Sequence, residues 1–106
     1  MPTAYITVPV DEADELARAL VEERLAACVN AVECNSVYRW RGEIHDDEEK
    51  ILFAKTTDER YDDLQTYVER HHPAEVPCIE RFDEDDELSA FAEWCDGSVG
   101  TDEERS

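Results

Sequence analysis

The sequence predicts an α+β domain with the ferredoxin-like order βαββαβ, an antiparallel sheet and one additional short helix near the C-terminus. Two short apolar segments have the composition of strands: 5–10, which is rich in β-branched residues, and 51–55, which is apolar on both faces. A segment with apolar residues at helical spacing follows each of them, and a further extended segment follows each helix. The 106 residues are therefore expected to form one domain of two βαβ halves.

The first half begins with a strand predicted over Tyr5–Val10, which ends at Pro9 because proline cannot donate a ladder hydrogen bond. Asp11 is a favourable N-cap residue, and the acidic residues after it complement the positive end of the helix dipole. Apolar residues then recur at helical spacing, so we expect a helix over Glu12–Ala27.

The second strand is predicted over Cys28–Arg41, with a bend near residues 33–35. Tyr38 and Trp40 lie two residues apart and therefore on one face of this strand, and Gly42 offers a place to turn. A chain of this size has little core to receive two such rings, so we expect a neighbouring subunit to cover them.

The second half is predicted to begin after an acidic turn at Ile44–Glu49. Ile51–Lys55 is apolar on both faces, which is typical of a central strand. Thr56 and Glu59 have the spacing of a capping box for the second helix, and Pro73 is expected to stop that helix.

The last elements are a fourth strand and a short helix. The strand is predicted over Val76–Phe82, and Pro77 places it at an edge or beside a bulge. Apolar residues spaced as one stripe predict a helix over Asp86–Cys95. The domain is thus expected to span residues 1–96, followed by an acidic, disordered tail over residues 97–106.

The chain is strongly acidic, with 29 acidic and 10 basic residues and a net charge of -19. This charge argues against partners that are nucleic acids or anionic membranes, since both require positive surfaces. Arginine outnumbers lysine, which is the pattern expected of a protein adapted to high salt, where screening suppresses self-repulsion. The alternative is a dedicated cation store, although scattered carboxylates form poor cages. We find no transmembrane segment or secretory signal and expect a cytoplasmic protein.

Five segments, in this order, resemble the CutA divalent-cation-tolerance proteins: Arg24–Asn30, Ser36–Ile44, Lys55-Thr56, His71–Pro73 with Glu75–Pro77, and Trp94. The resemblance implies a ferredoxin-like homotrimer, with Tyr38 and Trp40 at the trimer interface. It also implies a non-enzymatic role in tolerance of divalent metal ions, copper among them. CutA trimers are similar in architecture to PII signalling proteins, so the alternative is a regulatory trimer that binds a small molecule between subunits. A third possibility is a stable scaffold whose metal response is indirect.

The same resemblance places a metal site at His71 and His72, with a cysteine as a third ligand. Imidazole and thiolate together suit Cu(II) or another divalent cation, and no cofactor is otherwise required. Thr7 stands where some relatives carry a cysteine, so Cys28 is the substitute if the fold exposes it. The structural alternative is that histidines near a helix C-terminus interact favourably with the helix dipole. His45, beside acidic residues, is expected to lie in a solvated turn.

The candidate ligand cleft of the PII-like alternative contains Lys55, Glu75 and Arg39. Lys55 and Glu75 could pair between neighbouring strands or hold a small anionic ligand together. Arg39 and Arg41 are expected on the face opposite Tyr38, where they bind either a neighbour's carboxylates or an anion.

Catalytic motifs are absent from the sequence. The three glycines form no phosphate-binding loop, and no histidine stands in a recognisable catalytic motif. The four cysteines include no C-x-x-C pair, so a zinc ribbon or thioredoxin-type motif is excluded and free thiols are expected. We therefore predict that the protein is not an enzyme.

Overall fold

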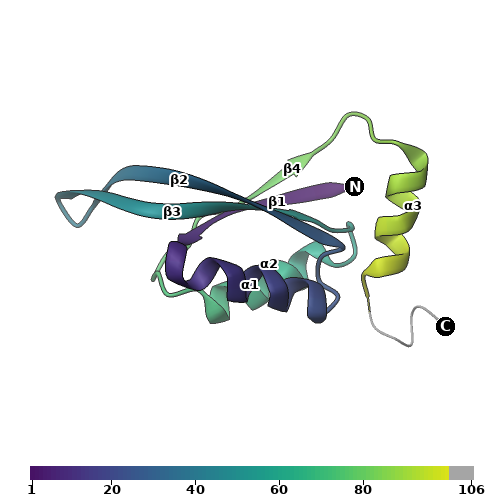
Figure 1. Ribbon diagram of the computed structural model, residues 1–106, viewed down its shortest axis with the longest axis horizontal. Coiled ribbons are helices and arrows are strands. Elements are labelled where there is room, and N and C mark those ends of the chain that lie inside the picture. The colour runs from purple at the N-terminus through teal and green to yellow at the C-terminus, as the bar shows by residue number, and fades with distance from the viewer. Residues whose placement is uncertain (101–106) are drawn as a thin grey trace.

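The computed structural model describes residues 1–100 and contains one antiparallel sheet with two helices on one face and a third helix beside one end (Figure 1). The strand order is β2-β3-β1-β4, which confirms the ferredoxin-like fold. The elements in chain order are β1 (Pro2–Pro9), α1 (Val10–Glu22), β2 (Cys28–Trp40), β3 (Glu43–Lys55), α2 (Tyr61–His71), β4 (Ile79–Asp83) and α3 (Ser89–Ser98). None of the helices within residues 1–100 is long and apolar enough to cross a membrane.

The hydrophobic core lies between the sheet and the helices α1 and α2. Alternate residues of β1 point into it, and Ala4, Ile6 and Val8 are fully buried there. Leu20 of α1 and Leu64 of α2 are equally buried against this face. The period of two in the strand and of 3.6 in the helices thus places one apolar face of each element in the same layer.

No helix formed by residues 1–100 covers the other face of the sheet, which is called here the open face. Three aromatic rings lie together on it: the Tyr5 ring is 5.7 Å from that of Phe53 and 5.3 Å from that of Phe82. Phe82 of β4 remains 45% exposed, and Val32 of β2, the other edge strand, is 49% exposed. A single chain therefore leaves a partly apolar sheet surface in contact with water.

The hairpin of β2 and β3 extends well beyond the helices (Figure 1). Its two strands pair without interruption from Cys28↔Lys55 to Trp40↔Glu43, so only Arg41 and Gly42 form the turn. Their φ values of 51° and 82° are those of a type I′ turn, whose twist matches that of the strands. The bend predicted at Gly42 is confirmed.

The acidic turn predicted over Ile44–Glu49 is wrong, because this segment is the outer half of β3. Each of its residues pairs in register with β2. This part of the hairpin can carry Asp and Glu side chains on both faces because both faces are open to water. The acidic composition of the segment therefore wrongly indicated a turn.

The predicted limits of the first helix also need correction. The helix α1 begins at Val10, one residue before the predicted cap Asp11, and ends at Glu22 rather than at Ala27. Arg24 adopts the left-handed conformation, with φ 57°, and the amide of Leu25 returns to the carbonyl of Leu20. This ending uses an arginine where glycine is usual, so no stop signal is visible in the sequence.

The capping box predicted at the second helix is not formed. The hydroxyl of Thr56 donates instead to the carbonyl oxygen of Leu25, 2.7 Å away and fully buried, and α2 begins at Tyr61. The stop predicted at Pro73 is confirmed, since α2 ends at His71.

The fourth strand and third helix both begin three residues later than predicted. Because β4 starts at Ile79, Pro77 lies before the strand, and β4 is an edge strand as expected. The helix α3 runs past the predicted domain end at residue 96, and Val99 is buried beside it. The amide of Gly100 donates to the carbonyl of Arg24, and residues 101–106 of the expected tail lie outside the described residues.

Candidate functional site

A groove of about 600 Å³ opens on the open face, between the strands β1 and β2 and the loop that joins α2 to β4. We call it the aromatic groove. It is lined by Tyr5, Thr7, Ser36, Tyr38, Trp40, Glu49, His72, Ala74, Glu75, Val76, Cys78 and Glu80.

The predicted pair Tyr38 and Trp40 forms one wall of this groove. Both side chains point to the same face, as strand alternation predicts, and remain 42% and 38% exposed. The Tyr38 hydroxyl donates to the Asp47 carboxylate, and this hydrogen bond raises the pKa of Tyr38. The Tyr38 ring also stacks on His45, with 5.3 Å between centroids. Cross-strand contacts therefore hold Tyr38 in place within one chain.

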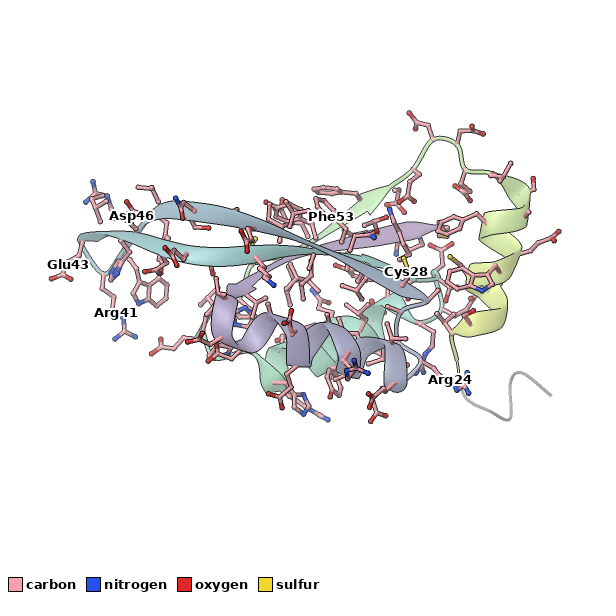
Figure 2. The ribbon with its side chains drawn as sticks, in the orientation of Figure 1. Arg24, Cys28, Arg41, Glu43, Asp46 and Phe53 are labelled. Carbon is pink, nitrogen blue, oxygen red and sulfur yellow. The ribbon has the colours of Figure 1, made fainter. Side chains whose placement is uncertain are left out.

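Arg41 lies at the hairpin turn, where Figure 2 labels it, and contacts two of the residues that line the groove. Its Nη2 donates to Oε2 of Glu75 at 2.6 Å, and its guanidinium lies 5.4 Å from the centroid of the Trp40 ring. The expectation that Arg41 lies on the face opposite Trp40 is therefore wrong. A residue with φ 51° in a turn no longer follows the alternation of the strand.

His72 lies against the groove with both ring nitrogens engaged. Its Nδ1 accepts the amide hydrogen of Ala74 at 3.0 Å, so this nitrogen carries no proton. Its Nε2 therefore bears the hydrogen and donates to the carbonyl of Thr7 at 2.7 Å. His72 is thus a neutral imidazole that fastens the loop to β1.

His71 faces away from the groove, toward cavities on the helical side. Its ring stacks on Tyr67, with 4.0 Å between centroids, and its Nδ1 donates to the carbonyl of the same residue at 2.8 Å. The hydrogen bond puts the proton on Nδ1 and leaves Nε2 as the acceptor nitrogen. Adjacent histidines at this helix end therefore point to different surfaces.

Cys28, the third predicted metal ligand, lies at the other end of the sheet. It pairs in register with Lys55 and is labelled near α3 in Figure 2, far from the hairpin turn. Its thiol is half-buried, and its Sγ lies 3.9 Å from Oδ1 of Asn30. Over residues 1–100, no three His, Cys, Asp or Glu side chains are placed to hold a metal ion together.

The three residues of the predicted ligand cleft are also separated. Lys55 donates to the Thr3 hydroxyl at 3.1 Å and lies 3.9 Å from Glu84. Glu75 is paired with Arg41 instead, so the predicted Lys55–Glu75 pair is wrong. Glu75 is the one member of this trio that lines the aromatic groove, and Arg39 does not line it.

Several groove residues escaped the sequence analysis. Glu49 reaches the groove because the long hairpin pairs it with Cys34 on the open face. Tyr5 lines its inner part, and burial is the main cause that raises the pKa of its hydroxyl. The signal that could have found Glu49 is the hairpin register, which was hidden by the prediction of a turn over Ile44–Glu49.

Comparisons of the sequence with known proteins give one consistent result. The family model described as CutA1 divalent ion tolerance protein matches residues 3–98. The divalent-cation tolerance protein CutA of Thermus thermophilus is 51% identical over 76 residues, which cover 70% of this chain and 74% of that protein.

Solved structures share the same fold. The PII-like protein CutA from Nostoc sp. PCC 7120, in apo form, has a TM-score of 0.91 at 28% identity and covers 94% of this chain and 98% of its own. The periplasmic divalent cation tolerance protein CutA from Archaeoglobus fulgidus has a TM-score of 0.89 at 33% identity, over 94% of this chain and 100% of its own. Sequence and fold thus match the same group of proteins over nearly the whole described chain.

Proposed function

Because this chain belongs to the CutA1 divalent ion tolerance protein family, we propose that it is a non-enzymatic, trimeric protein of divalent metal tolerance that binds cations such as Cu(II) weakly. The family match over residues 3–98 carries this proposal. The large negative charge supports it, since a net charge of -19 attracts cations to the surface.

The proposed homotrimer is supported by the open face. Tyr5, Phe53 and Phe82 form an aromatic cluster there that no helix covers. Burial of apolar surface contributes about 25 cal/mol per Å², so a second copy placed on this face would stabilise it. Tyr38 and Trp40 extend the same face and are the proposed interface aromatics.

The proposed metal site at His71, His72 and Cys28 would need more than one chain. His71 has an acceptor nitrogen available at Nε2, whereas His72 would have to give up a hydrogen bond to bind a metal. Cys28 lies at the other end of the sheet. A site that draws His71 and Cys28 from different copies, with modest affinity, is consistent with these positions.

Two measurements test this proposal. Light scattering is expected to give three times the 12.2 kDa chain mass. Calorimetric titration with Cu(II) is expected to show weaker binding for His71→Ala and Cys28→Ser, and unchanged binding for the control His45→Ala. A chain-mass particle, or a His71→Ala variant that binds copper as the unaltered protein does, would contradict the proposal.

The second candidate function is a PII-like regulatory trimer that binds a small molecule in clefts between subunits. The aromatic groove of about 600 Å³ favours it, because ligand pockets typically span about 300–1,000 Å³. Lys55, Glu75 and Arg39 are the residues proposed for such clefts. A thermal-shift screen of metabolites tests it: a metabolite that raises the melting temperature when metal ions do not would favour this function over metal binding.

We also propose that the protein is cytoplasmic. All four cysteines are free thiols, which a reducing compartment preserves. The relative from Archaeoglobus fulgidus is described as periplasmic, so cell fractionation followed by immunodetection is the direct test. Recovery outside the cytoplasmic fraction would contradict the proposal.

A further inference from the structure

We infer that a pocket between α2 and α3 binds a small zwitterion, such as an amino acid. We call it the α2–α3 pocket, and it lies at the end of the molecule where α2 begins and α3 ends (Figure 1). Its volume of about 700 Å³ falls within the range of about 300–1,000 Å³ that is typical of ligand pockets. Its lining residues include Thr57, Glu59, Arg60 and Asp63 on the side of α2 and Asp96 and Gly97 on the side of α3.

The position of this pocket is compatible with the proposed trimer, which covers the open face of the sheet. None of the lining residues belongs to a strand, because they come from the loop after β3, from α2 and from the end of α3. Arg60 and Asp63 also line a cavity on the helical side toward which His71 points. The pocket therefore stays open to solvent when further copies cover the sheet. The inference goes beyond the proposed function, since it requires no metal ion.

Two hydrogen-bond donors at the pocket have no partner. Thr57 is 5% exposed, and its hydroxyl has no hydrogen-bond partner among residues 1–100. Arg60 donates from Nη1 to Asp63 at 2.9 Å, but its buried Nε has no acceptor within the same residues. A buried polar group without a partner is destabilising, so both donors favour a ligand that brings an acceptor. A carboxylate has two oxygens and can accept from both.

The two helix ends at the pocket carry opposite partial charges. The N-terminal end of α2 is positive and the C-terminal end of α3 is negative, because the peptide dipoles of each helix are aligned. The last turn of α3 contains no basic residue that would neutralise its carbonyl groups. A ligand with a carboxylate and an ammonium group can therefore place its negative end at α2 and its positive end at α3.

The charged side chains disfavour simpler ligands. Three carboxylates and one arginine line the pocket, so a simple anion would meet a negative surface. A simple cation would leave the donors of Thr57 and Arg60 unpaired. Neither Glu59 nor Asp96 forms an ion pair with a lysine or arginine within residues 1–100, so both are available to an ammonium group. A zwitterion is the class of ligand that satisfies both sets of groups.

Glycine is a suitable probe, because two related compounds each lack one of its charges: the methyl ester keeps the ammonium group and acetate keeps the carboxylate. Heteronuclear NMR at constant KCl and slightly acidic pH measures binding through the amide signals of Thr57 and Gly97. We expect saturable shifts with glycine, and at least about tenfold weaker binding of the ester and of acetate, because each loses charge-assisted hydrogen bonds. Equal binding of acetate or of the ester, or no saturable shift with glycine, would overturn the inference.

The Thr57→Val variant tests the carboxylate end of the ligand. It removes the hydroxyl and is expected to weaken glycine binding by about tenfold. The melting temperature of the free protein is expected not to fall, since this hydroxyl has no partner there. Thr66→Val is the matched control, because Thr66 is an exposed threonine of α2 that lines a different cavity. Equal effects of the two changes on glycine binding would overturn the role given to Thr57.

The Asp96→Asn variant tests the ammonium end. It is expected to weaken glycine binding by about two- to fivefold, the range of an exposed ion pair, and to strengthen the binding of acetate by removing a repulsion. Glu93→Gln is the control, since it removes the same charge from an exposed position of α3 outside the pocket lining. Equal effects of both changes would overturn the role given to Asp96. Copper titrations do not enter these tests, so failure of the metal proposal and failure of this inference are distinguishable.

Discussion

The two faces of the sheet are built by alternate residues of the same strands, yet they have different chemistry. The helix-covered face of β1 carries Ala4, Ile6 and Val8, which are fully buried. The open face carries Tyr5 and Thr7, which are half-buried and line a groove. The difference indicates that one face holds the fold of the single chain, while the other is available to ligands or to further copies.

Adjacent residues of β3 allow the strongest test of this division. Leu52 is fully buried on the helix-covered face, so Leu52→Ala is expected to lower the free energy of unfolding by about 2–5 kcal/mol. Denaturation with guanidinium at fixed protein concentration measures the loss. A loss below about 1 kcal/mol would show that the core is less closely packed than the structure indicates.

Phe53, the next residue, is the matched control on the open face. It is half-buried and contacts the Tyr5 ring. If further copies cover this face, the destabilisation caused by Phe53→Ala will depend on protein concentration, because association and folding are then linked. A loss that is the same at all concentrations would indicate that the open face is free in solution.

The dependence of the melting temperature on salt tests the contribution of the acidic surface to stability. The net charge of -19 produces self-repulsion that KCl screens, so the melting temperature is expected to rise between low and molar KCl. A rise of roughly 10 °C would correspond to a gain of a few kcal/mol or less for a domain of this size. Sucrose is the control, because it acts without screening charge. No rise in KCl would contradict the account of a surface adapted to high salt.

Much of the fold could be predicted from the sequence, because the buried face follows strict periods. The apolar segment at 51–55 and the helical stripe ending before Pro73 are fixed by core packing, and both were located. The outer half of β3 was missed because none of its side chains enters the hydrophobic core, so their composition was free to resemble a turn. The end of α1 was missed because Arg24 takes a conformation that glycine usually provides.

The candidate site was less accessible to prediction. Tyr38, Trp40 and Glu75 were singled out and do meet at one groove. Lys55 was one candidate partner for Glu75, whereas tertiary placement brings Arg41 to it. Spacing along a strand shows which residues share a face, but the path of the loop from α2 to β4 decides which of them touch.

Two glycines, one in the hairpin turn and one in α3, are expected to change the stability in opposite directions when each is replaced by alanine. Gly42 has φ 82°, and a Cβ added there would meet nothing within 4 Å. Gly42→Ala is therefore expected to destabilise by about 1 kcal/mol through backbone strain alone. Gly97 lies in α3 and is equally open, so Gly97→Ala is expected to stabilise by about 0.5–1 kcal/mol. Thermal unfolding of both variants measures the two effects. A neutral Gly42→Ala would contradict the turn geometry.

The smallest expected effect lies at the rim of the helix-covered face, where Arg81 holds Asp83. The Arg81 guanidinium donates to both carboxylate oxygens of Asp83, at 2.8–3.1 Å, and this hydrogen bonding lowers the pKa of Asp83 below its ordinary 3.8. A lowered pKa in the folded state means that the contribution of Asp83 to stability is complete above the unfolded value. It is lost as the pH falls through the folded value.

The stability difference between the unaltered protein and Asp83→Asn should therefore be constant near neutral pH and shrink below about pH 4. Urea denaturation at a series of pH values measures it, with Asp46→Asn on the hairpin as the charge-matched control (Figure 2). The effect is small, because the Asp83 side chain is 63% exposed and solvent screens the pair. A difference that grows as the pH falls would have the wrong sign for a carboxylate stabilised in its charged form.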